Sequence, residues 1–249
     1  YVLLGGSPGS GKTLVAASFE PLQQNSTLIG RYFAGGYRGS DLPPAYYREI
    51  ATFASWLSNE ASIRSQSAIA VTAATPTADL GSSIAKNLKA LSESLKTGER
   101  GVLIIDGVDT ATLTHSVDFL DFLPSAPPPG LVIVLITTNP LSLRETYDHL
   151  SIGRDVEMGR LPQYDCEWLI LKRLRDKVLP SQAATIAERS EGHPLTLQYF
   201  VNEVAACPAD HVEEAIARLE RSAGPTAYYE RVWNRLPANG TSRYLLATI

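Results

Sequence analysis

The chain has 249 residues, of which 44% are hydrophobic and 19% are charged, a composition typical of a globular protein with a buried core. This length suits one large domain or two smaller ones. The formal net charge is -4 at pH 7 and Lys and Arg are scattered along the sequence, so neither nucleic acid nor an anionic membrane surface is indicated as the main partner.

The cysteines and the apolar runs bear on the compartment. Cys166 and Cys207 are far apart and lack metal-ligand spacing, so we expect reduced thiols packed as small apolar residues in a cytoplasmic protein. No apolar run reaches the length of about eighteen residues that crosses a bilayer, so we expect no membrane partner. The sequence starts inside an expected strand and ends in an apolar run, and we therefore expect a piece of a longer protein with sensor and effector domains outside it.

The first predicted elements surround a glycine-rich loop. A strand is expected over Tyr1–Leu4 and a helix from Lys12 to about Gln23, with the sequence Gly-Ser-Pro-Gly-Ser-Gly-Lys-Thr between them. This order predicts a phosphate-binding loop, because glycines let backbone N–H groups face the phosphates at a helix N-terminus. We expect the nucleotide to be bound by Gly6, Ser7, Pro8, Gly9, Ser10, Gly11, Lys12, Thr13 and Leu14. A glycine turn that merely precedes a helix is the alternative.

Two residues at the end of this loop are suited to bind the phosphates and their metal ion. Lys12 brings a cation to the β- and γ-phosphates, and the Thr13 hydroxyl is suited to bind the Mg²⁺ that bridges them.

The next segments alternate between helix and strand patterns. A strand is expected over 27–34, followed by a loop dense in turn formers at 35–44. A helix then begins near Pro44, because apolar residues recur three or four apart at Tyr47, Ile50, Phe53, Ala54 and Leu57. The segment 65–77 fits either a helix extension or a short strand and stays unassigned. Another helix is expected from Asp79 to Leu95, ended by Gly98.

Two short apolar runs, Val102–Ile105 and Leu131–Ile136, are too uniform for a sheet with a wet face and predict central parallel strands. A helical run around 117–123 joins them, and the prolines at 127–129 end it. The alternation predicts a doubly wound α/β domain over 1–160, with ligands at the carboxyl ends of its strands.

Acidic residues follow the first of these runs. A carboxylate that leaves a buried strand beside a phosphate loop is suited to hold Mg²⁺, so we expect Asp106 in the metal site with Thr13. Asp109 is expected to orient or deprotonate the attacking water. A turn closed by an aspartate side chain is the other interpretation of this Asp-Gly-x-Asp segment.

The second run ends in Thr137-Thr138-Asn139-Pro140. We expect Asn139 to hydrogen-bond the γ-phosphate or the water and so to report the phosphate state. Asn before Pro is also a favoured helix start, and both roles can hold together. The predicted catalytic set is therefore Lys12, Asp106, Asp109 and Asn139.

Beyond Leu161 the strand patterns stop, and helices are expected at 164–174, 181–191, 194–206, 209–221 and 225–236. Gly192 closes one helix and Pro194 opens the next, with His193 between them. On physical grounds alone this segment is helix punctuation, since a single His in a turn is more often solvated or capping than catalytic.

Taken in order, these segments resemble the signal-transduction ATPases with numerous domains (STAND), the class that includes the NACHT and NB-ARC switch modules. Residues 6–13 resemble their Walker A motif, 102–109 a NACHT-style Walker B, 137–139 their sensor, and 192–195 their Gly-x-Pro-Leu motif. The resemblance implies a P-loop NTPase domain, a small all-helical lid at 161–223 and the start of a winged-helix domain at 224–249. It also implies that Pro194 lies over the adenine or ribose and His193 near the phosphates.

The function implied is an ATP- or ADP-binding switch of a signalling or defence protein, with Mg²⁺-dependent hydrolysis and self-association on activation. Thr110 stands where NACHT modules usually carry Glu, so we expect slow hydrolysis. Asn139 stands where NB-ARC modules carry Arg and resembles the sensor of AAA+ ATPases, whereas Gly107 departs from the AAA+ pattern. An oligomeric AAA+ ATPase, a small-molecule P-loop kinase with Arg31 or Arg38 in its lid, and a scaffold that binds nucleotide without hydrolysis remain alternatives.

Overall fold

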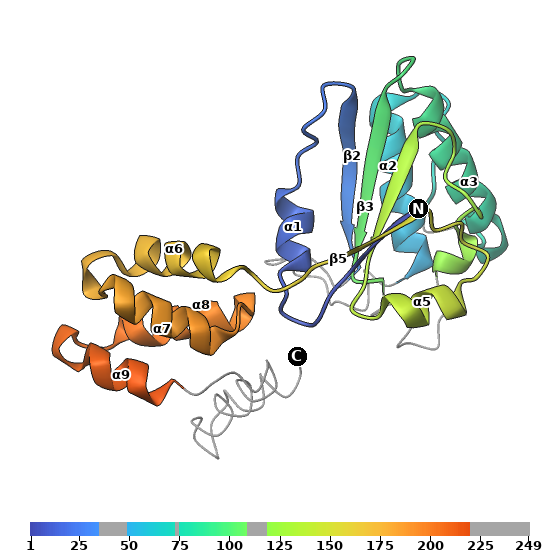
Figure 1. Cartoon of the computed structure of the whole chain (residues 1–249). Coiled ribbons are helices and arrows are strands. Elements are labelled where there is room, and N and C mark those ends of the chain that lie inside the picture. The colour runs from blue at the N-terminus through green and yellow to red at the C-terminus, as the bar shows by residue number, and fades with distance from the viewer. Residues whose placement is uncertain (35–48, 73–74, 109–118, 220–249) are drawn as a thin grey trace. The chain divides into compact units, whose positions relative to one another are not determined.

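The computed structural model describes residues 1–34, 49–72, 75–108 and 119–219. The chain divides into two compact units. One, called here the sheet unit, contains residues 1–7 and 12–158, and the other, the helical unit, contains residues 8–11 together with the chain from 159 onward. Figure 1 labels elements of both.

The sheet unit is built on five parallel strands in the order β2-β3-β4-β1-β5. They are β1 (Val2–Gly5), β2 (Ser26–Phe33), β3 (Arg100–Asp106), β4 (Leu131–Ile136) and β5 (Arg154–Glu157). The predicted central strands, β3 and β4, are adjacent and mostly buried, which confirms that their uniform apolar runs face protein on both sides. The predicted doubly wound α/β fold is therefore confirmed.

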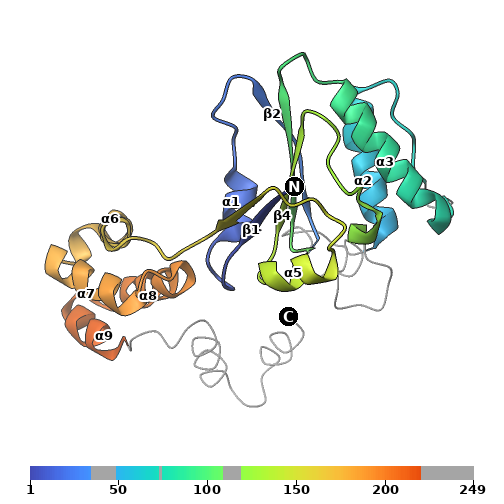
Figure 2. The same cartoon turned by 45° about the vertical axis from the view of Figure 1, so that its right-hand side comes forward.

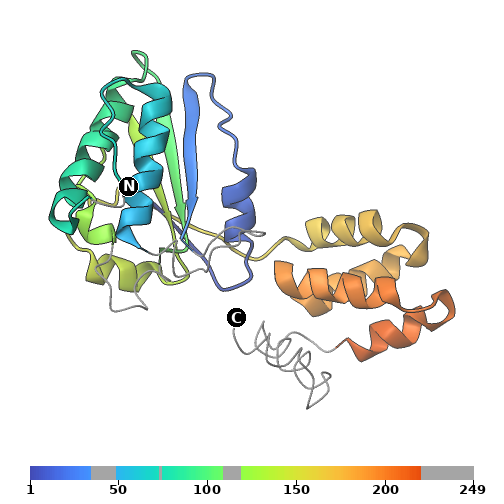
Figure 3. The ribbon, with the colours of Figure 1, turned by 180° about the vertical axis from the view of Figure 1, so that it is seen from behind.

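Helices cover both faces of this sheet. Helices α2 (Ile50–Arg64) and α3 (Thr77–Glu93) lie side by side over one face, as Figures 2 and 3 show, and pack on the larger core. Helix α1 (Lys12–Ser18) packs on the opposite face through a smaller apolar cluster. The alternation along β3 explains this division, since Leu103 and Ile105 face the larger core and Val102 and Ile104 the smaller one.

Helix α1 ends at Ser18, before the predicted end near Gln23. Pro21 disfavours the helical conformation of the residue before it. The guanidinium of Arg31, on β2, donates hydrogen bonds to the carbonyl oxygens of Ala16 and Phe19 and so satisfies the last turn of the helix.

In the segment left unassigned at 65–77, the described residues before α3 lie outside helix and strand, and a side chain of α3 fixes part of them. Asn87 of α3 accepts a hydrogen bond from the backbone N–H of Ile69 at 2.8 Å and donates one to the carbonyl oxygen of the same residue at 3.0 Å. Both the donor and the acceptor of this backbone unit are thereby paired without a helix or a strand neighbour.

Two features of the sheet unit differ from the sequence expectations. The helical run around 117–123 is a short 3-10 helix, η2 (Phe119–Phe122), within the described residues. Strand β5 was not predicted, because its residues are exposed at the sheet edge and carry only one apolar side chain, Val156. Helix α5 (Pro140–Thr146) follows β4, and its Arg144 forms a 2.6 Å ion pair with Asp155 of β5.

The helical unit confirms the expected helices within the described residues. They are α6 (Gln163–Leu174), α7 (Pro180–Ser190), α8 (Pro194–Ala206) and α9 (Val212–Arg218), with 3-10 turns η3 (Arg175–Lys177) and η4 (Ala209–His211). Their apolar faces share one core that includes Cys166, Ile170, Ile186, Phe200 and Val204. The predicted helix at 225–236 and the predicted winged-helix start at 224–249 lie outside the described residues.

Basic side chains close two of these helices. Lys177 donates to the carbonyl oxygens of Ala205, at 2.7 Å, and of Cys207 beyond the end of α8. Arg189 of α7 donates to carbonyl oxygens at the end of α9, including that of Leu219 at 2.7 Å. Cations at helix C-termini satisfy the last carbonyls and oppose the negative end of the dipole.

Cys166 and Cys207 are free thiols. Among the helices that the structure describes, none has the length and apolar character needed to cross a membrane.

Candidate nucleotide site

The glycine-rich loop leaves β1 at Gly5 and enters α1 at Lys12. Gly9 and Gly11 have φ angles of 78° and 95°, a region that residues with a side chain rarely adopt. These glycines allow the loop to turn tightly around a ligand, as the sequence motif predicts.

The ammonium group of Lys12 is held inside this loop. Its Nζ atom donates hydrogen bonds to the carbonyl oxygens of Gly6 at 2.6 Å and of Ser7 at 3.0 Å, and the residue is only 8% exposed. The loop thus folds back over the cation and keeps it at the start of α1, where the helix dipole also attracts negative charge.

Ser10 provides an independent indication of a ligand. It is 4% exposed, and within the described part of the chain its Oγ atom is buried without any hydrogen-bond partner. Leaving a buried hydroxyl unpaired costs about 1–3 kcal/mol. A phosphate oxygen in the loop would accept this hydrogen bond, so the residues present fit a bound nucleotide phosphate.

The remaining residues of the predicted set are accessible at the same end of α1. Thr13, in its first turn, is exposed, and Leu14 is 72% exposed. No group of three or more His, Cys, Asp or Glu side chains suited to a metal occurs among the described residues.

The sheet topology brings Asp106 to the edge where the loop begins. In the paired strands, Asp106 of β3 lies opposite Ile136 of β4, which lies opposite Leu4 of β1. The strands β1 and β3 are therefore separated by one strand, about 10 Å in all at the usual strand spacing. Asp106 is 7% exposed, so its carboxylate stands at the end of a buried strand, as expected.

Between these two strand ends lies Thr137, which the sequence analysis did not single out. It is 1% exposed, its N–H donates to the carbonyl oxygen of Leu4, and its Oγ1 accepts a hydrogen bond from the N–H of Asn139. The signal was present in the sequence, because Thr137 is the first polar residue after a fully apolar strand.

Asn139 itself is exposed and begins α5. Its Oδ1 accepts a hydrogen bond from the N–H of Ser142 at 3.1 Å, with Pro140 at the first helical position. The capping interpretation is thus confirmed, and the amide NH₂ group is the part suited to donate to a phosphate. The sensing role stays a prediction. Asp109, the expected water-orienting residue, lies outside the described residues.

In the helical unit, His193 is buried at the start of α8. Its Nδ1 accepts a hydrogen bond from the N–H of Thr196, so Nδ1 carries no proton and the neutral ring has its proton on Nε2. The Nε2–H group then donates to the carbonyl oxygen of Pro8 at 3.1 Å. Pro8–Gly11 belong to this same unit.

The tip of the loop also packs on this helix start. A β-carbon at Gly9 would lie 2.9 Å from both His193 Cε1 and Leu195 Cβ, so only glycine allows this approach. Pro194 occupies the first turn of α8. The predicted site residues that the structure describes therefore form two groups. One lies at an edge of the sheet unit and contains Lys12, Thr13, Asp106 and Asn139. The other lies in the helical unit and contains His193 with the loop tip, Pro8 and Gly9.

The fold of this chain is similar to that of proteins of known structure. No protein-family model and no curated protein matches the sequence. The Walker-type ATPase paby2304 of Pyrococcus abyssi is similar with a TM-score of 0.55 and 16% identity, over 95% of this chain and 71% of that one. The Aeropyrum pernix ORC2 protein, solved in ADPNP–ADP complexes, is similar with a TM-score of 0.52 and 12% identity, over 92% of this chain.

This chain spans 64% of the length of the ORC2 chain. Together with the strand order, these two likenesses show that the chain has the α/β fold of P-loop NTPases.

Proposed function

We propose that the protein is an ATP- or ADP-binding switch module of the STAND type, in which slow Mg²⁺-dependent hydrolysis resets a signal carried by the bound nucleotide. The observation that carries this proposal is that the glycine-rich loop presents two groups suited to bind a phosphate. A buried Ser10 hydroxyl has no hydrogen-bond partner in the described chain, and the Lys12 ammonium is enclosed by the loop's own carbonyl oxygens. Both groups match what a phosphate needs.

The chemistry follows from these groups. When a triphosphate binds, Lys12 exchanges the carbonyl oxygens of Gly6 and Ser7 for phosphate oxygens, which accept a stronger, charge-assisted hydrogen bond. Thr13 and Asp106 would hold Mg²⁺, which would supply positive charge to neutralise the phosphates. The Thr137 hydroxyl and the Asn139 amide, after the strand between the loop and Asp106, then contact the γ-phosphate or the attacking water.

The proposed switch role is inferred from the contacts of the loop tip, Pro8 and Gly9. Pro8 accepts a hydrogen bond from His193, and Gly9 packs against His193 and Leu195 at the start of α8. A phosphate that changes the loop backbone therefore changes the acceptor presented to His193. In this proposal, the helical residues act as a lid that responds to the nucleotide, and the response controls self-association and the sensor and effector domains fused to this module.

The decisive experiment identifies the nucleotide that the protein carries. The protein is purified without added nucleotide and denatured, and the released small molecules are analysed by chromatography. We expect ADP at close to one equivalent, and we expect Lys12→Ala to carry none. Lys177→Ala is the matched control, since Lys177 also holds two backbone carbonyl oxygens but lies in the helical unit. A Lys12→Ala protein that binds ATP with wild-type affinity would refute the proposal.

An oligomeric AAA+ ATPase is the second candidate. It is favoured by Asn139, which follows β4, the strand next to the strand that ends in Asp106. Turnover of many ATP molecules per second by an assembled ring, lost when one arginine at the subunit boundary is replaced, would support it over the switch.

The kinase alternative has less support. Arg31, one of its two candidate lid residues, is bound to carbonyl oxygens at the end of α1 and to Glu20 at 3.1 Å, while Arg38 lies outside the described residues. Phosphate release without a second substrate would count against a kinase. Nucleotide binding without any phosphate release would instead support a scaffold.

A further inference from the structure

The segment that enters the helical unit is bound directly to the turn that carries His193. The N–H of Leu161 donates to the carbonyl oxygen of Gly192 at 2.8 Å. A β-carbon at Gly192 would lie 2.3 Å from the Leu161 carbonyl oxygen, and Gly192 has a φ of 72°. Only glycine lets these two backbones approach so closely, so the contact depends on this residue type.

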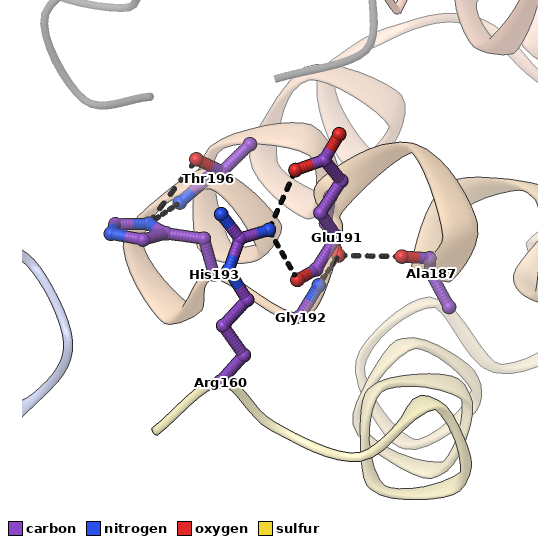
Figure 4. Close-up of polar contacts among 7 residues, drawn as sticks. Arg160, Ala187, Glu191, Gly192, His193 and Thr196 are labelled. Atoms are coloured by element: carbon purple, nitrogen blue, oxygen red, sulfur yellow. Dashed lines mark hydrogen bonds and ion pairs between the residues drawn. The ribbon is translucent and has the colours of Figure 1, made fainter. Parts of the chain in front are cut away.

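Arg160 adds a second, polar connection between the same two segments. Its Nη1 atom donates to the Glu191 carboxylate at 2.6 Å and to the Glu191 carbonyl oxygen at 3.1 Å (Figure 4). One nitrogen thus holds both the side chain and the backbone of Glu191, which lies directly before Gly192 in the turn.

Glu191 is an unusual residue for its position. It ends α7 in the left-handed conformation, with φ 49° and ψ 28°, where glycine or asparagine is the ordinary choice. A residue with a β-carbon is disfavoured there by about 1–2 kcal/mol. The ion pair is solvent-accessible, with side chains 63% and 42% exposed, and exposed pairs contribute about 0–1 kcal/mol. Stability therefore does not explain why glutamate stands here.

Further hydrogen bonds connect Glu191 to the residue that carries the imidazole, His193. Ser190 Oγ accepts a hydrogen bond from the N–H of Gly192 and donates one to the carbonyl oxygen of Ala187, so the turn is anchored to α7. The N–H of His193 donates to the carbonyl oxygen of Ser190. The backbone of the turn is thus paired from α7 to the start of α8, with Arg160 holding its exposed side.

We propose that Arg160 and Glu191 are positioning residues that hold the His193 ring in its Nε2–H form against the Pro8 carbonyl oxygen of the loop. The inference deepens the proposed function, on which its nucleotide consequence rests. Without this Arg160–Glu191 pair, called here the clamp, the turn gains freedom at Glu191 and Gly192, and the His193 ring exchanges between tautomers. The loop tip then loses the donor by which the helical unit responds to the bound phosphate.

The test observes His193 directly in the nucleotide-free protein, by NMR of ¹⁵N-labelled histidine side chains, with the signals assigned through a His193→Gln variant. In the wild type we expect well-separated Nδ1 and Nε2 shifts, the signature of one tautomer. In Arg160→Ala and in Glu191→Gly we expect the two shifts to move toward their average. Arg160→Lys, which keeps a cation for Glu191, should restore much of the separation. The exchanged pair Arg160→Glu with Glu191→Arg should do the same.

The choice of Glu191→Gly separates positioning from stability. Glycine relieves the left-handed strain, so we expect the melting temperature to stay equal or to rise while the tautomer signature is lost. The matched control is Arg218→Ala, which removes an exposed ion pair with Glu214 in the same unit and should leave His193 unchanged. If Arg160→Ala fails to fold, Glu191→Gly still decides the question. Wild-type tautomer shifts in Glu191→Gly would overturn the proposal.

Nucleotide affinity gives the second readout. We expect the ratio of ATP to ADP dissociation constants to change several-fold in Arg160→Ala and not at all in Arg218→Ala. If the wild type binds no nucleotide, the proposed function fails, whereas the His193 signature still tests the clamp. If nucleotide binds but neither clamp variant moves the signature or the ratio, the clamp is wrong and the proposed function stands.

Discussion

Gly5 and Pro140 are in such close contact that a β-carbon at Gly5 would lie 2.2 Å from Pro140 Cγ. Gly5 ends β1 just before the phosphate loop, and Pro140 begins α5 just after Asn139. The proline ring has little freedom to retreat. The start of the loop and the first residue of α5 can therefore pack this closely only because residue 5 has no side chain.

We expect Gly5→Ala to displace the start of α5 and to destabilise the protein by about 1–3 kcal/mol, the usual cost of overpacking. Urea unfolding followed by circular dichroism measures this change. Gly98→Ala is a useful comparison, because a β-carbon there meets nothing within 4 Å and only the backbone strain at φ 81° remains. Equal stability of Gly5→Ala and the wild type would show that α5 adapts freely.

Replacing Ser10 separates folding from binding. Because its hydroxyl is buried without a partner in the described chain, Ser10→Ala should stabilise the nucleotide-free protein by about 1 kcal/mol. The same change removes a donor to phosphate and should weaken nucleotide binding roughly tenfold. Chemical denaturation and isothermal titration calorimetry measure the two effects. Ser7→Ala, at an exposed loop position, is the control for stability. A loss of both stability and affinity would mean that Ser10 has a structural partner.

Asn139 offers a test that distinguishes capping from sensing. Asn139→Ser keeps a good cap for α5, whereas Asn139→Ala removes it and should cost about 1 kcal/mol. If the amide NH₂ group contacts the γ-phosphate, both variants should slow ATP hydrolysis about tenfold or more, although only the alanine variant loses stability. Phosphate release and thermal melting are the measurements. Wild-type hydrolysis by Asn139→Ser would leave Asn139 with a capping role alone.

Arg189 holds the end of α9 from the neighbouring helix α7. Its guanidinium donates to the carbonyl oxygens of Ile216, Ala217 and Leu219, so Arg189→Ala leaves several helix-end carbonyls without their donor. We expect a loss of about 2 kcal/mol, in the range for hydrogen bonds to a charged group, and faster amide hydrogen exchange in α9. Arg218→Ala, whose ion pair is exposed, should change stability by less than about 0.5 kcal/mol. Similar losses in the two variants would contradict this assignment.

The two thiols should differ in reactivity. Burial raises the pKa of the Cys166 thiol, with smaller contributions from Asp165 and Glu167, against the opposing effect of a hydrogen bond with Ser190. A raised pKa lowers the thiolate fraction at any pH below it, so alkylation at pH 8 should modify the partly exposed Cys207 and spare Cys166. Mass spectrometry after iodoacetamide treatment counts the modified thiols. Rapid modification of Cys166 in the native protein would show that the core of the helical unit opens readily. The same assay checks the folding of the other helical-unit variants.

Local patterns in the sequence determined the elements and the chemistry of the loop. Glycines followed by Lys12 at a helix start predict a phosphate-binding loop from the sequence alone, because the backbone amides and the helix dipole are local properties. The apolar runs of β3 and β4 identified the central strands, and the spacing of apolar residues identified the helices from α6 to α8. Strand β5 was not predicted, because an exposed edge strand has no regular spacing of apolar residues.

Only the tertiary structure decided which distant residues meet. The order of the strands places β4 between β1 and β3, which makes Thr137 a neighbour of both the loop strand and Asp106. The pairing of Arg160 with Glu191, and of His193 with Pro8, joins residues that no local period relates. The physical reason is that helix and strand propensities act over a few residues, whereas these contacts follow from how complete elements pack.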